Sequence, residues 1–406
     1  MKTIIILADG AADEPIAELG GKTPLQAAKT PFIDLLASKG KNGLLDTIPE
    51  GFKPGSEIAN LSVLGYNVPS VFEGRGSLEA ASMGVDILPG EMAMRCNLIC
   101  VEDGKIKNHS AGHISSEEAE VLIRFLDKEL NDGTVSFHPG VSYRHLLKMK
   151  GGDKQLDCTA PHDVPGTPFR DVLIKAAAPS AEATADYLNK LIIKSQELLK
   201  DHPVNLKRIA EGKDPANSIW PWSPGYHPTM ATLQEMVGIK TGSVISAVDL
   251  IQGIGKYAGL RQIHVKGATG LYDTNYEGKA QAALDALKEE DFVYLHIEAS
   301  DEAGHEGDYK LKTLTIEYLE NRVVKTIYEA TRDWEEPVTI AILPDHPTPC
   351  RLKTHTKSPV PFLIYRSNEE GDDVQTYDEF AAEKGAYGLL KGKEFMETLF
   401  GVKIKD

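Results

Sequence analysis

The sequence predicts an α/β fold in which a doubly wound sheet of parallel strands is interrupted by an inserted α+β domain. Three apolar runs, at residues 3–8, 292–297 and 338–343, are rich in branched residues, and the segments that separate them contain Gly and Pro. Such runs are typical of strands that are buried on both faces. Segments of helical pattern separate the runs, and strands that alternate with helices are typical of a doubly wound sheet.

The acidic residues that follow these runs lie near both ends of the chain and not in its middle, which indicates a discontinuous domain. The chain of 406 residues is also too long for one ordinary core. We expect residues 1–87 and 236–406 to form one domain and residues 88–235 to form the inserted one. The first boundary follows a segment rich in Gly, and the second follows a segment rich in Pro and Trp.

Two strands and one long helix are expected in the inserted domain. The strands are predicted at residues 92–101 and 133–138. The helix is predicted to run from Ser180, as its N-cap, to about residue 200. The apolar residues expected on one face of this helix are Tyr187, Leu188, Leu191, Ile192, Leu198 and Leu199.

After the insertion, strands and helices alternate again. Strands are predicted at residues 243–248, 263–265 and 362–365, and an Ala-rich helix at residues 278–290. Residues 310–332 are predicted to form one helix with alternating charge on its exposed face. These elements add to the sheet that begins with residues 3–8.

The composition is that of a soluble globular protein, with 41% hydrophobic and 26% charged residues. The 44 basic and 60 acidic residues give a net charge of −16, which argues against a nucleic-acid or anionic-membrane partner. No apolar stretch approaches the roughly 20 residues of a membrane helix, and we expect no signal peptide. The four cysteines lack the spacing of a metal site, so we expect reduced thiols in a cytoplasmic protein.

The segment from Asp301 to His305 is the most informative candidate for metal binding. If it opens a helix, the two side chains stand at positions i and i+4 on one face, where they can share a metal ion. The alternative is an acidic helix N-terminus that happens to contain a histidine.

Asp345 and His346 follow directly after an apolar run. Adjacent residues of a regular strand point to opposite faces, so both can reach one site only from a turn. Pro344 and Pro347 favour such a turn, and His355 follows within a short loop. The alternative is a Pro-rich surface loop with two unrelated histidines.

Ser56 lies where a loop, residues 54–61, is expected to enter a helix. It is either an ordinary N-cap or a nucleophile at a helix N-terminus, where free amides suit a phosphorylated serine. A serine hydroxyl needs a base or a metal to become nucleophilic at neutral pH. Asp9 ends the first apolar run and is either a further ligand or part of a simple turn. Carboxylate and imidazole ligands of this kind suit Mn²⁺ or Zn²⁺.

The order of Asp9, Gly55-Ser56, Asp301-Glu-Ala-Gly-His305, Asp345-His346 and His355 resembles the alkaline phosphatase superfamily. Within it, the chain is most similar to the archaeal-type, cofactor-independent phosphoglycerate mutases. The phrases that add to the match are Leu7-Ala8-Asp9-Gly10, Gly74-Arg75-Gly76, Met94-Arg95-Cys96-Asn97, Val141-Ser142-Tyr143-Arg144-His145 and Pro161-His162-Asp163. The resemblance spans nearly the whole chain and implies an alkaline-phosphatase-like sheet with an inserted lid domain.

The resemblance implies two divalent metal ions, Mn²⁺ before Zn²⁺, Mg²⁺ or Co²⁺. One ion would be held by Asp301, His305 and His355, and the other by the set Asp9, Ser56, Asp345 and His346. It also implies that Ser56 takes the phosphoryl group of 3-phosphoglycerate and returns it to the 2-hydroxyl, and that Lys256 neutralises developing charge. The expected partner is therefore a small anionic phosphorylated substrate, and the oligomeric state stays open.

The inserted domain would supply the contacts to the substrate and exclude water. Arg144 and Asp163 are the catalytic candidates, Asp163 as a base that moves a proton between the glycerate hydroxyls. The residues expected to bind the substrate are Arg75, Arg95, His162 and Arg170. Arginine suits bidentate capture of carboxylate or phosphate, although each of these residues could instead form an ordinary salt bridge.

Three alternatives remain open from the sequence. The same site could serve a phosphatase-like hydrolase or a homoserine kinase-type phosphotransferase, although Gly253-Ile254-Gly255-Lys256-Tyr257 lacks the spacing of a P-loop. A metal-binding module without catalysis would be expected to lack a ligand or the nucleophile, and none is missing. The stretch around Trp220 and Trp222 is either a hydrophobic plug between domains or a loop that shapes the substrate site.

Overall fold

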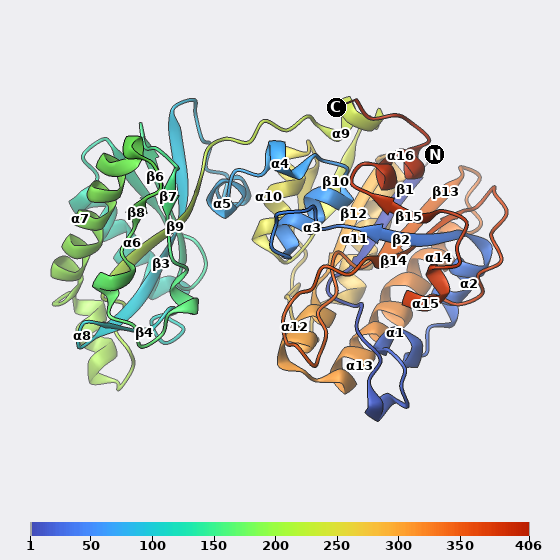
Figure 1. The fold of residues 1–406 in the computed structure, drawn as a ribbon, viewed down its shortest axis with the longest axis horizontal. Helices are drawn as coiled ribbons and strands as arrows, with labels where there is room; N and C mark the ends of the chain where they lie inside the picture. Colours follow the sequence, from blue (N-terminus) through green and yellow to red (C-terminus); the bar gives the residue numbers. More distant parts are fainter. Residues whose placement is uncertain (1, 406) are drawn as a thin grey trace. The chain divides into compact units, whose positions relative to one another are not determined.

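The structure, a computed structural model, describes residues 2–405 and divides the chain into two compact units (Figure 1). Unit 1 comprises Met1–Phe72 and Thr229–Asp406, and unit 2 comprises Glu73–Pro228. Unit 2 therefore begins earlier than the boundary expected after residue 87. The reason is that helix α5 (Arg75–Ser82) packs against two strands of unit 2, β3 and β9.

Unit 1 is built on an eight-stranded sheet with the order β11-β10-β12-β1-β13-β14-β2-β15. All pairs are parallel except those that β14 forms with β13 and β2. The strands are β1 (Lys2–Ala8), β2 (Lys41–Asp46), β10 (Gly242–Ile245), β11 (Arg261–Ile263), β12 (Phe292–Ile297), β13 (Val338–Leu343), β14 (Val360–Arg366) and β15 (Gly388–Lys391).

The three apolar runs of the sequence form the centre of this sheet, as predicted, because β1 pairs with β12 on one side and with β13 on the other. The strand predicted at residues 243–248 ends earlier, at Ile245. Its chain turns away because the Ser246 hydroxyl accepts a hydrogen bond from the backbone N–H of Val248 at 2.9 Å. The late strand β14 is also longer than predicted and runs antiparallel to its neighbours.

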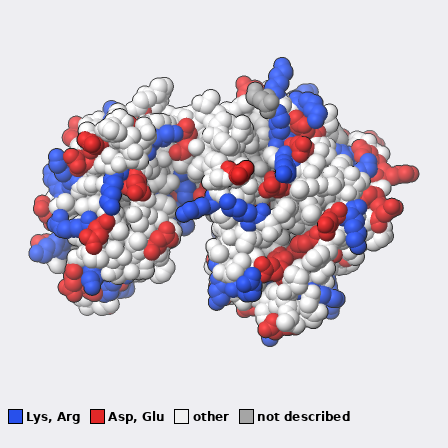
Figure 2. All heavy atoms as spheres, viewed as in Figure 1, with Lys and Arg blue, Asp and Glu red and all other residues white. Residues whose placement is uncertain are grey.

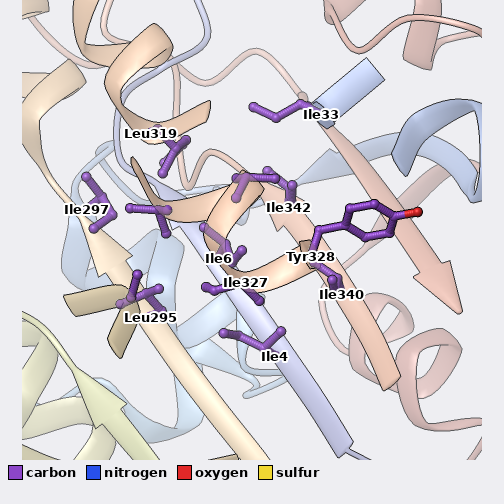
Figure 3. Packing of buried hydrophobic residues seen from close by; sticks show 14 of the residues in the cluster. Ile4, Ile6, Ile33, Leu295, Ile297, Leu319, Ile327, Tyr328, Ile340 and Ile342 are labelled. Atoms are coloured by element: carbon purple, nitrogen blue, oxygen red, sulfur yellow. The ribbon is translucent and has the colours of Figure 1, made fainter. Parts of the chain in front are cut away.

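Helices cover both faces of the sheet, which makes it doubly wound. On one face, Ile4 and Ile6 of β1 pack against apolar residues of the helices α2, α13 and α14 (Figure 3). On the other, Phe292 of β12 contacts Phe400 of α16, and Tyr294 reaches α3. The helices of unit 1 are α1 (Pro24–Ala27), α2 (Pro31–Lys39), α3 (Ser56–Val63), α4 (Val68–Val71), α9 (Leu233–Val237), α10 (Asp249–Tyr257), α11 (Tyr276–Glu289), α12 (Ala299–Glu306), α13 (Tyr309–Leu319), α14 (Lys325–Thr331), α15 (Glu379–Ala382) and α16 (Glu394–Phe400), with a short 3₁₀ turn η1 (Ala17–Leu19).

The helix predicted at residues 310–332 is interrupted. Helices α13 and α14 are joined by one turn of π-helix, η5 (Glu320–Val324). Glu320 lies at the start of this turn, and its carboxylate accepts the backbone N–H groups of Phe32 and Ile33 at 2.7 and 2.9 Å. These amides are unpaired donors in the first turn of α2, so the wide turn helps to cap a neighbouring helix.

Unit 2 has an antiparallel sheet with the order β4-β3-β6-β5, and β9 pairs with β3. Helices α6 and α7 cover one face of this sheet, whereas α5 packs on Ala93 and Leu146 of the other. Its strands are β3 (Glu91–Glu102), β4 (Lys105–Asn108), β5 (Val135–His138), β6 (Arg144–Lys150), β7 (Leu156–Asp157), β8 (Lys175–Ala176) and β9 (Ser218–Gly225). Its other helices are α6 (Ser116–Leu130), α7 (Glu182–Leu199) and α8 (Pro203–Ala210), with the 3₁₀ turns η2 (Pro161–Asp163), η3 (Phe169–Val172) and η4 (Pro179–Ala181).

Two details of unit 2 differ from the predictions. Ser180 is not the N-cap of the long helix, because it lies in η4 and the cap position of α7 is Ala181. The stretch around Trp220 and Trp222 is neither a loop nor a plug between domains, because it forms β9 and buries both indoles in the core of unit 2. The stretch forms a strand because its backbone pairs with β3, and a Pro-rich sequence does not predict such pairing.

The surfaces of both units carry interspersed acidic and basic side chains on the face that Figure 2 shows. No helix within residues 2–405 is both long and apolar enough to cross a membrane. The cysteines Cys96, Cys100, Cys158 and Cys350 are all free thiols.

Buried His145 of β6 is expected to make the stability of unit 2 depend on pH. Its Nδ1 accepts the backbone N–H of Gly140 at 3.0 Å, and burial lowers its pKa from 6.5 to about 3. Below pH 6.5, His145 is therefore protonated in the unfolded chain but stays neutral in the folded chain. The contribution of the neutral ring to stability is complete above pH 6.5 and is lost as the pH falls towards 3. Between pH 7 and 5 we expect a loss of up to about 2 kcal/mol.

The variant His145→Asn keeps an acceptor for Gly140 and cannot be protonated. We expect its stability to vary less between pH 7 and 5 than that of the wild type. Denaturant unfolding followed by tryptophan fluorescence measures this, since unit 2 holds Trp220 and Trp222. Equal pH dependence in the two proteins would contradict the prediction.

Candidate active site

The candidate ligands meet at the carboxyl ends of three adjacent parallel strands of unit 1. Asp9 follows β1, and Asp345 and His346 lie in a bend after β13. Asp301 lies in the first turn of α12, which follows β12. Because β12, β1 and β13 are parallel neighbours, their ends lie at one edge of the sheet, where open α/β sheets bind ligands.

One group of potential ligands consists of Asp9, Asp345 and His346, whose side chains are all buried. His346 Nε2 lies 3.7 Å from Asp9 Oδ1 and 3.5 Å from Asp345 Oδ2. The Asp345 carboxylate is fixed by the backbone N–H groups of Gly10 and His346, at 3.2 and 2.9 Å from Oδ1. The bend after β13 thus turns two adjacent side chains towards one point, as the sequence predicted.

A second group forms around Asp301. His305 Nε2 lies 3.3 Å from its Oδ2, and His355 Nε2 lies 3.4 Å from its Oδ1. The predicted i and i+4 relation of Asp301 and His305 is correct, because both lie in α12. The two groups adjoin, since His346 can also join Asp301 and His355 in a set of three potential ligands.

The charges of this site depend on each other. Burial and the nearby carboxylate of Asp345 raise the pKa of Asp9 well above its usual range. Asp301 is equally buried, but hydrogen bonds from His305 and His355 hold its pKa well below the usual range. The hydrogen bond to Asp301 in turn raises the pKa of His305 to about 9. Two buried carboxylates side by side are costly unless a positive charge compensates them.

The residues present fit a divalent cation in the first group. Asp9 Oδ1 is buried and has no hydrogen-bond partner within the described residues. It faces His346 Nε2, and carboxylate oxygen and imidazole nitrogen are the donors that Mn²⁺ and Zn²⁺ accept. A buried oxygen without a hydrogen-bond donor destabilises the folded protein, and a bound cation would compensate its charge.

Ser56 is the first residue of α3, and its cap position is occupied by Gly55. The interpretation of Ser56 as an N-cap is therefore wrong, and its hydroxyl is not used to close the helix. Instead, Ser56 Oγ lies 3.2 Å from His346 Nε2. The first turn of a helix also offers free amides and a partial positive charge, which favour an anion at this position.

Asn60 is a site residue to which the sequence assigned no role. Its Nδ2 donates to Asp345 Oδ2 at 2.9 Å and to the backbone oxygen of Ser56 at 2.8 Å. Its Oδ1 accepts from the hydroxyl of Tyr294 at 2.5 Å. The signal was the spacing, since Ser56 and Asn60 stand at i and i+4 on one face of α3.

His296 of β12 is a second residue that sequence reasoning missed. It is fully buried, and its Nε2 lies 2.8 Å from Asp9 Oδ2 while its Nδ1 lies 3.1 Å from the hydroxyl of Ser246. Burial lowers its pKa to about 3, so the ring is neutral and can donate to Asp9 while it accepts from Ser246. The signal was a histidine inside an otherwise apolar strand. Partners of this kind orient the ligands of metal sites.

Gly10 makes the close approach of β1 to α12 possible. Its φ angle is +62°, and a Cβ at this position would lie 2.6 Å from the Cα of Asp301. A larger residue would therefore be strained and would push Asp301 away. The Asp9-Gly10 pair is thus a requirement of the site and not a simple turn.

Lys256 lies near the end of α10, is half-buried, and belongs to a helix that packs against α3. The other predicted residues belong to unit 2. Arg95 is buried beside Glu79 at 2.9 Å, and burial, together with the charges of Arg75 and Arg144, lowers its pKa. The charges of Arg75 and Arg144 thus act on Arg95, and we refer to these three residues as the basic cluster.

Aromatic and imidazole rings adjoin this basic cluster. His162 packs edge-on against Trp222 at 5.6 Å and against His109 at 6.0 Å. Asp163 is exposed and lies 3.5 Å from the His162 ring, and exposed Arg170 lies over the ring of Phe169. His109 was missed by sequence reasoning, which had no signal for it beyond the residue type.

Taken together, the fold and site of unit 1 define an α/β enzyme with a buried centre of carboxylates, imidazoles and one serine. Comparison with known proteins identifies the family. Residues 37–205 match the family model described as 2,3-bisphosphoglycerate-independent phosphoglycerate mutase. The enzyme of that name from Methanosarcina acetivorans is 50% identical over 99% of this chain and 100% of its own length. A probable enzyme of the same name from Geobacter sulfurreducens is 46% identical over 98% of this chain and 99% of its own.

Solved structures agree with this result. A protein from Pyrococcus horikoshii is similar with a TM-score of 0.83 and 32% identity over 100% of this chain and 98% of that one. The cofactor-independent phosphoglycerate mutase from Thermoplasma acidophilum is similar with a TM-score of 0.69 and 28% identity over 99% of both chains. The chain therefore belongs to the family of 2,3-bisphosphoglycerate-independent phosphoglycerate mutases, which are isomerases.

Proposed function

We propose that this enzyme interconverts 3-phosphoglycerate and 2-phosphoglycerate through a phosphoserine at Ser56. The observation that carries the proposal is the position of Ser56 Oγ, 3.2 Å from His346 Nε2 at the N-terminus of α3. The names of relatives that match over nearly the full chain support the choice of substrate.

In the first step, Ser56 Oγ loses its proton and forms a bond to phosphorus as the bond from phosphorus to O3 of glycerate breaks, and O3 takes up a proton. In the second, O2 of glycerate loses its proton and attacks phosphorus, and the bond to Ser56 breaks as Ser56 Oγ takes up a proton. No phosphoryl group is gained or lost overall, provided that water is excluded. Asp163 is our candidate for moving the proton between O2 and O3.

We assign two divalent ions to this site, with Mn²⁺ as the first candidate. The groups that would hold them are Asp9, Asp345 and His346 with Ser56, and Asp301, His305 and His355. Such ions would supply positive charge that stabilises the serine alkoxide and the phosphoryl oxygens. His296 and Asn60 keep Asp9 and Asp345 in place for them.

The basic cluster of unit 2 is our candidate for binding the acid groups of the substrate. Arg75, Arg95 and Arg144 offer planar donors that suit a carboxylate or a phosphate. His162 is held against Trp222 and completes the set.

An assay of the purified enzyme with 3-phosphoglycerate, coupled to enolase, tests the proposal. We expect turnover with added Mn²⁺, loss of turnover after chelation, and recovery on return of the metal. A parallel assay with homoserine and ATP tests the kinase-type alternative. Turnover of homoserine without an enolase-coupled signal would overturn the mutase proposal.

A further inference from the structure

Thr348 is a fully buried residue that touches both groups of potential ligands. Its hydroxyl donates a hydrogen bond to Asp301 Oδ1, in the second group. The same oxygen lies 3.3 Å from Nδ1 of His346, in the first group. No role was assigned to this residue from the sequence, which placed it only in a Pro-rich loop.

The two contacts fix the position of a proton on His346. A threonine hydroxyl carries one proton, and a carboxylate can only accept, so that proton is used on Asp301. The hydroxyl oxygen can then only accept from its other neighbour, so Nδ1 of His346 carries a proton. In a neutral ring this leaves a lone pair on Nε2.

We infer that the Thr348 hydroxyl is a positioning group that sets the tautomer of His346 and tethers Asp301. It thereby directs the Nε2 lone pair at Asp9 Oδ1, Asp345 Oδ2 and Ser56 Oγ, which lie at 3.7, 3.5 and 3.2 Å. A lone pair beside two carboxylates forms a site that only a cation or a proton donor can satisfy. For metal binding, the inference rests on the proposed function.

The backbone of Thr348 is anchored independently of its side chain. Its N–H donates to the backbone oxygen of Ala12 at 3.2 Å, and its own backbone oxygen accepts from Lys312 Nζ at 2.9 Å. Gly304 of α12 allows the close approach, since a Cβ at 304 would collide with that oxygen. Substitution of the side chain therefore removes the hydroxyl and leaves these anchors in place.

A neighbouring histidine is arranged by the same rule. Nδ1 of His305 lies 3.0 Å from the backbone oxygen of Lys353, which can only accept, so this nitrogen also carries a proton. Its Nε2 then faces Asp301 at 3.3 Å. Both rings thus turn Nε2 into the site, where the Nε2 of His305 donates to Asp301 in the metal-free protein.

The test compares Thr348→Val, which keeps the shape, with Thr348→Ser, which keeps the hydroxyl. Thr331→Val is the matched control, because the Thr331 hydroxyl is buried and, within residues 2–405, donates to the backbone oxygen of Ile327 in its own helix. Long-range ¹H–¹⁵N spectra of the metal-free proteins report the histidine tautomers, with the signals of His346 assigned from a His346→Gln variant. Titration with Mn²⁺ reports the affinity.

We expect the wild type and Thr348→Ser to show the proton on Nδ1 of His346, and Thr348→Val to lose this preference. We expect Thr348→Val to bind Mn²⁺ about 10–100-fold more weakly, while Thr331→Val binds as the wild type does. A proton on Nε2 in the wild type, or unchanged affinity in Thr348→Val, would overturn the inference. Failure of the wild type to bind any divalent ion would contradict the proposed function, whereas the spectra of the metal-free protein would still decide the tautomer.

Discussion

Replacement of Ser56 by alanine is expected to lower kcat by at least about 10³-fold, because removal of a nucleophile leaves only binding and electrostatic effects. The Ser56 side chain does not cap α3, since Gly55 holds the cap position. The loss of its hydroxyl should therefore leave the fold and the thermal unfolding temperature nearly unchanged. The enolase-coupled assay and a thermal melt of the same preparation measure both quantities.

Ser62→Ala is the matched control, because Ser62 lies in the same helix and its buried hydroxyl has no hydrogen-bond partner within residues 2–405. We expect this variant to keep its activity. Labelling gives a second readout, since substrate carrying ³²P in its phosphate should label the wild type and not Ser56→Ala. Unchanged turnover in Ser56→Ala would rule out the phosphoserine mechanism.

Replacement of Lys312 by methionine is expected to lower the free energy of unfolding of unit 1 by about 3–5 kcal/mol, as the removal of one partner of a buried ion pair does. Lys312 Nζ lies 2.8 Å from Asp13 Oδ2, and neither side chain is more than 1% exposed. The same ammonium group donates to the backbone oxygens of Ala12 and Thr348. The variant would leave a buried carboxylate and two carbonyl groups without this donor.

Lys310→Met is the control, because Lys310 lies in the same helix with its side chain exposed. We expect its effect to stay within about 0.5 kcal/mol. Hydrogen exchange of peptides from β1 and β13 during urea unfolding reads unit 1 separately from unit 2. Equal stability of the two variants would show that the buried pair contributes nothing.

The central strands could be predicted because each corresponds to a continuous apolar run of neighbouring residues. Residues 292–297 and 338–343 are continuous apolar runs, and the predicted bounds match those of β12 and β13. Other elements depended on distant partners. The π-helical turn η5 follows from the contact of Glu320 with α2, and β9 follows from its pairing with β3. No window of the sequence contains these interactions.

Several candidate ligands could be predicted for the same reason, since Asp9 and Asp345 follow strands and Ser56 opens a helix. Their supporting residues could not. Histidine, asparagine and threonine occur in many structural roles. Only the tertiary contacts of His296, Asn60 and Thr348 show that these residues support the site. The N-cap reading of Ser56 failed because residue preference does not reveal that Gly55 takes the cap position.

By itself, the sequence determined the fold class and the order of the central strands in the chain, and its family resemblance implied the seven residues proposed to hold the metal ions. Local apolar pattern and turn residues carry the information about the strands, because they act over a few neighbouring positions. Only the tertiary structure decided that β12, β1 and β13 lie side by side and that His346 faces Ser56, Asp9 and Asp345. These contacts join residues far apart in the chain, so their geometry depends on the packing of the whole sheet.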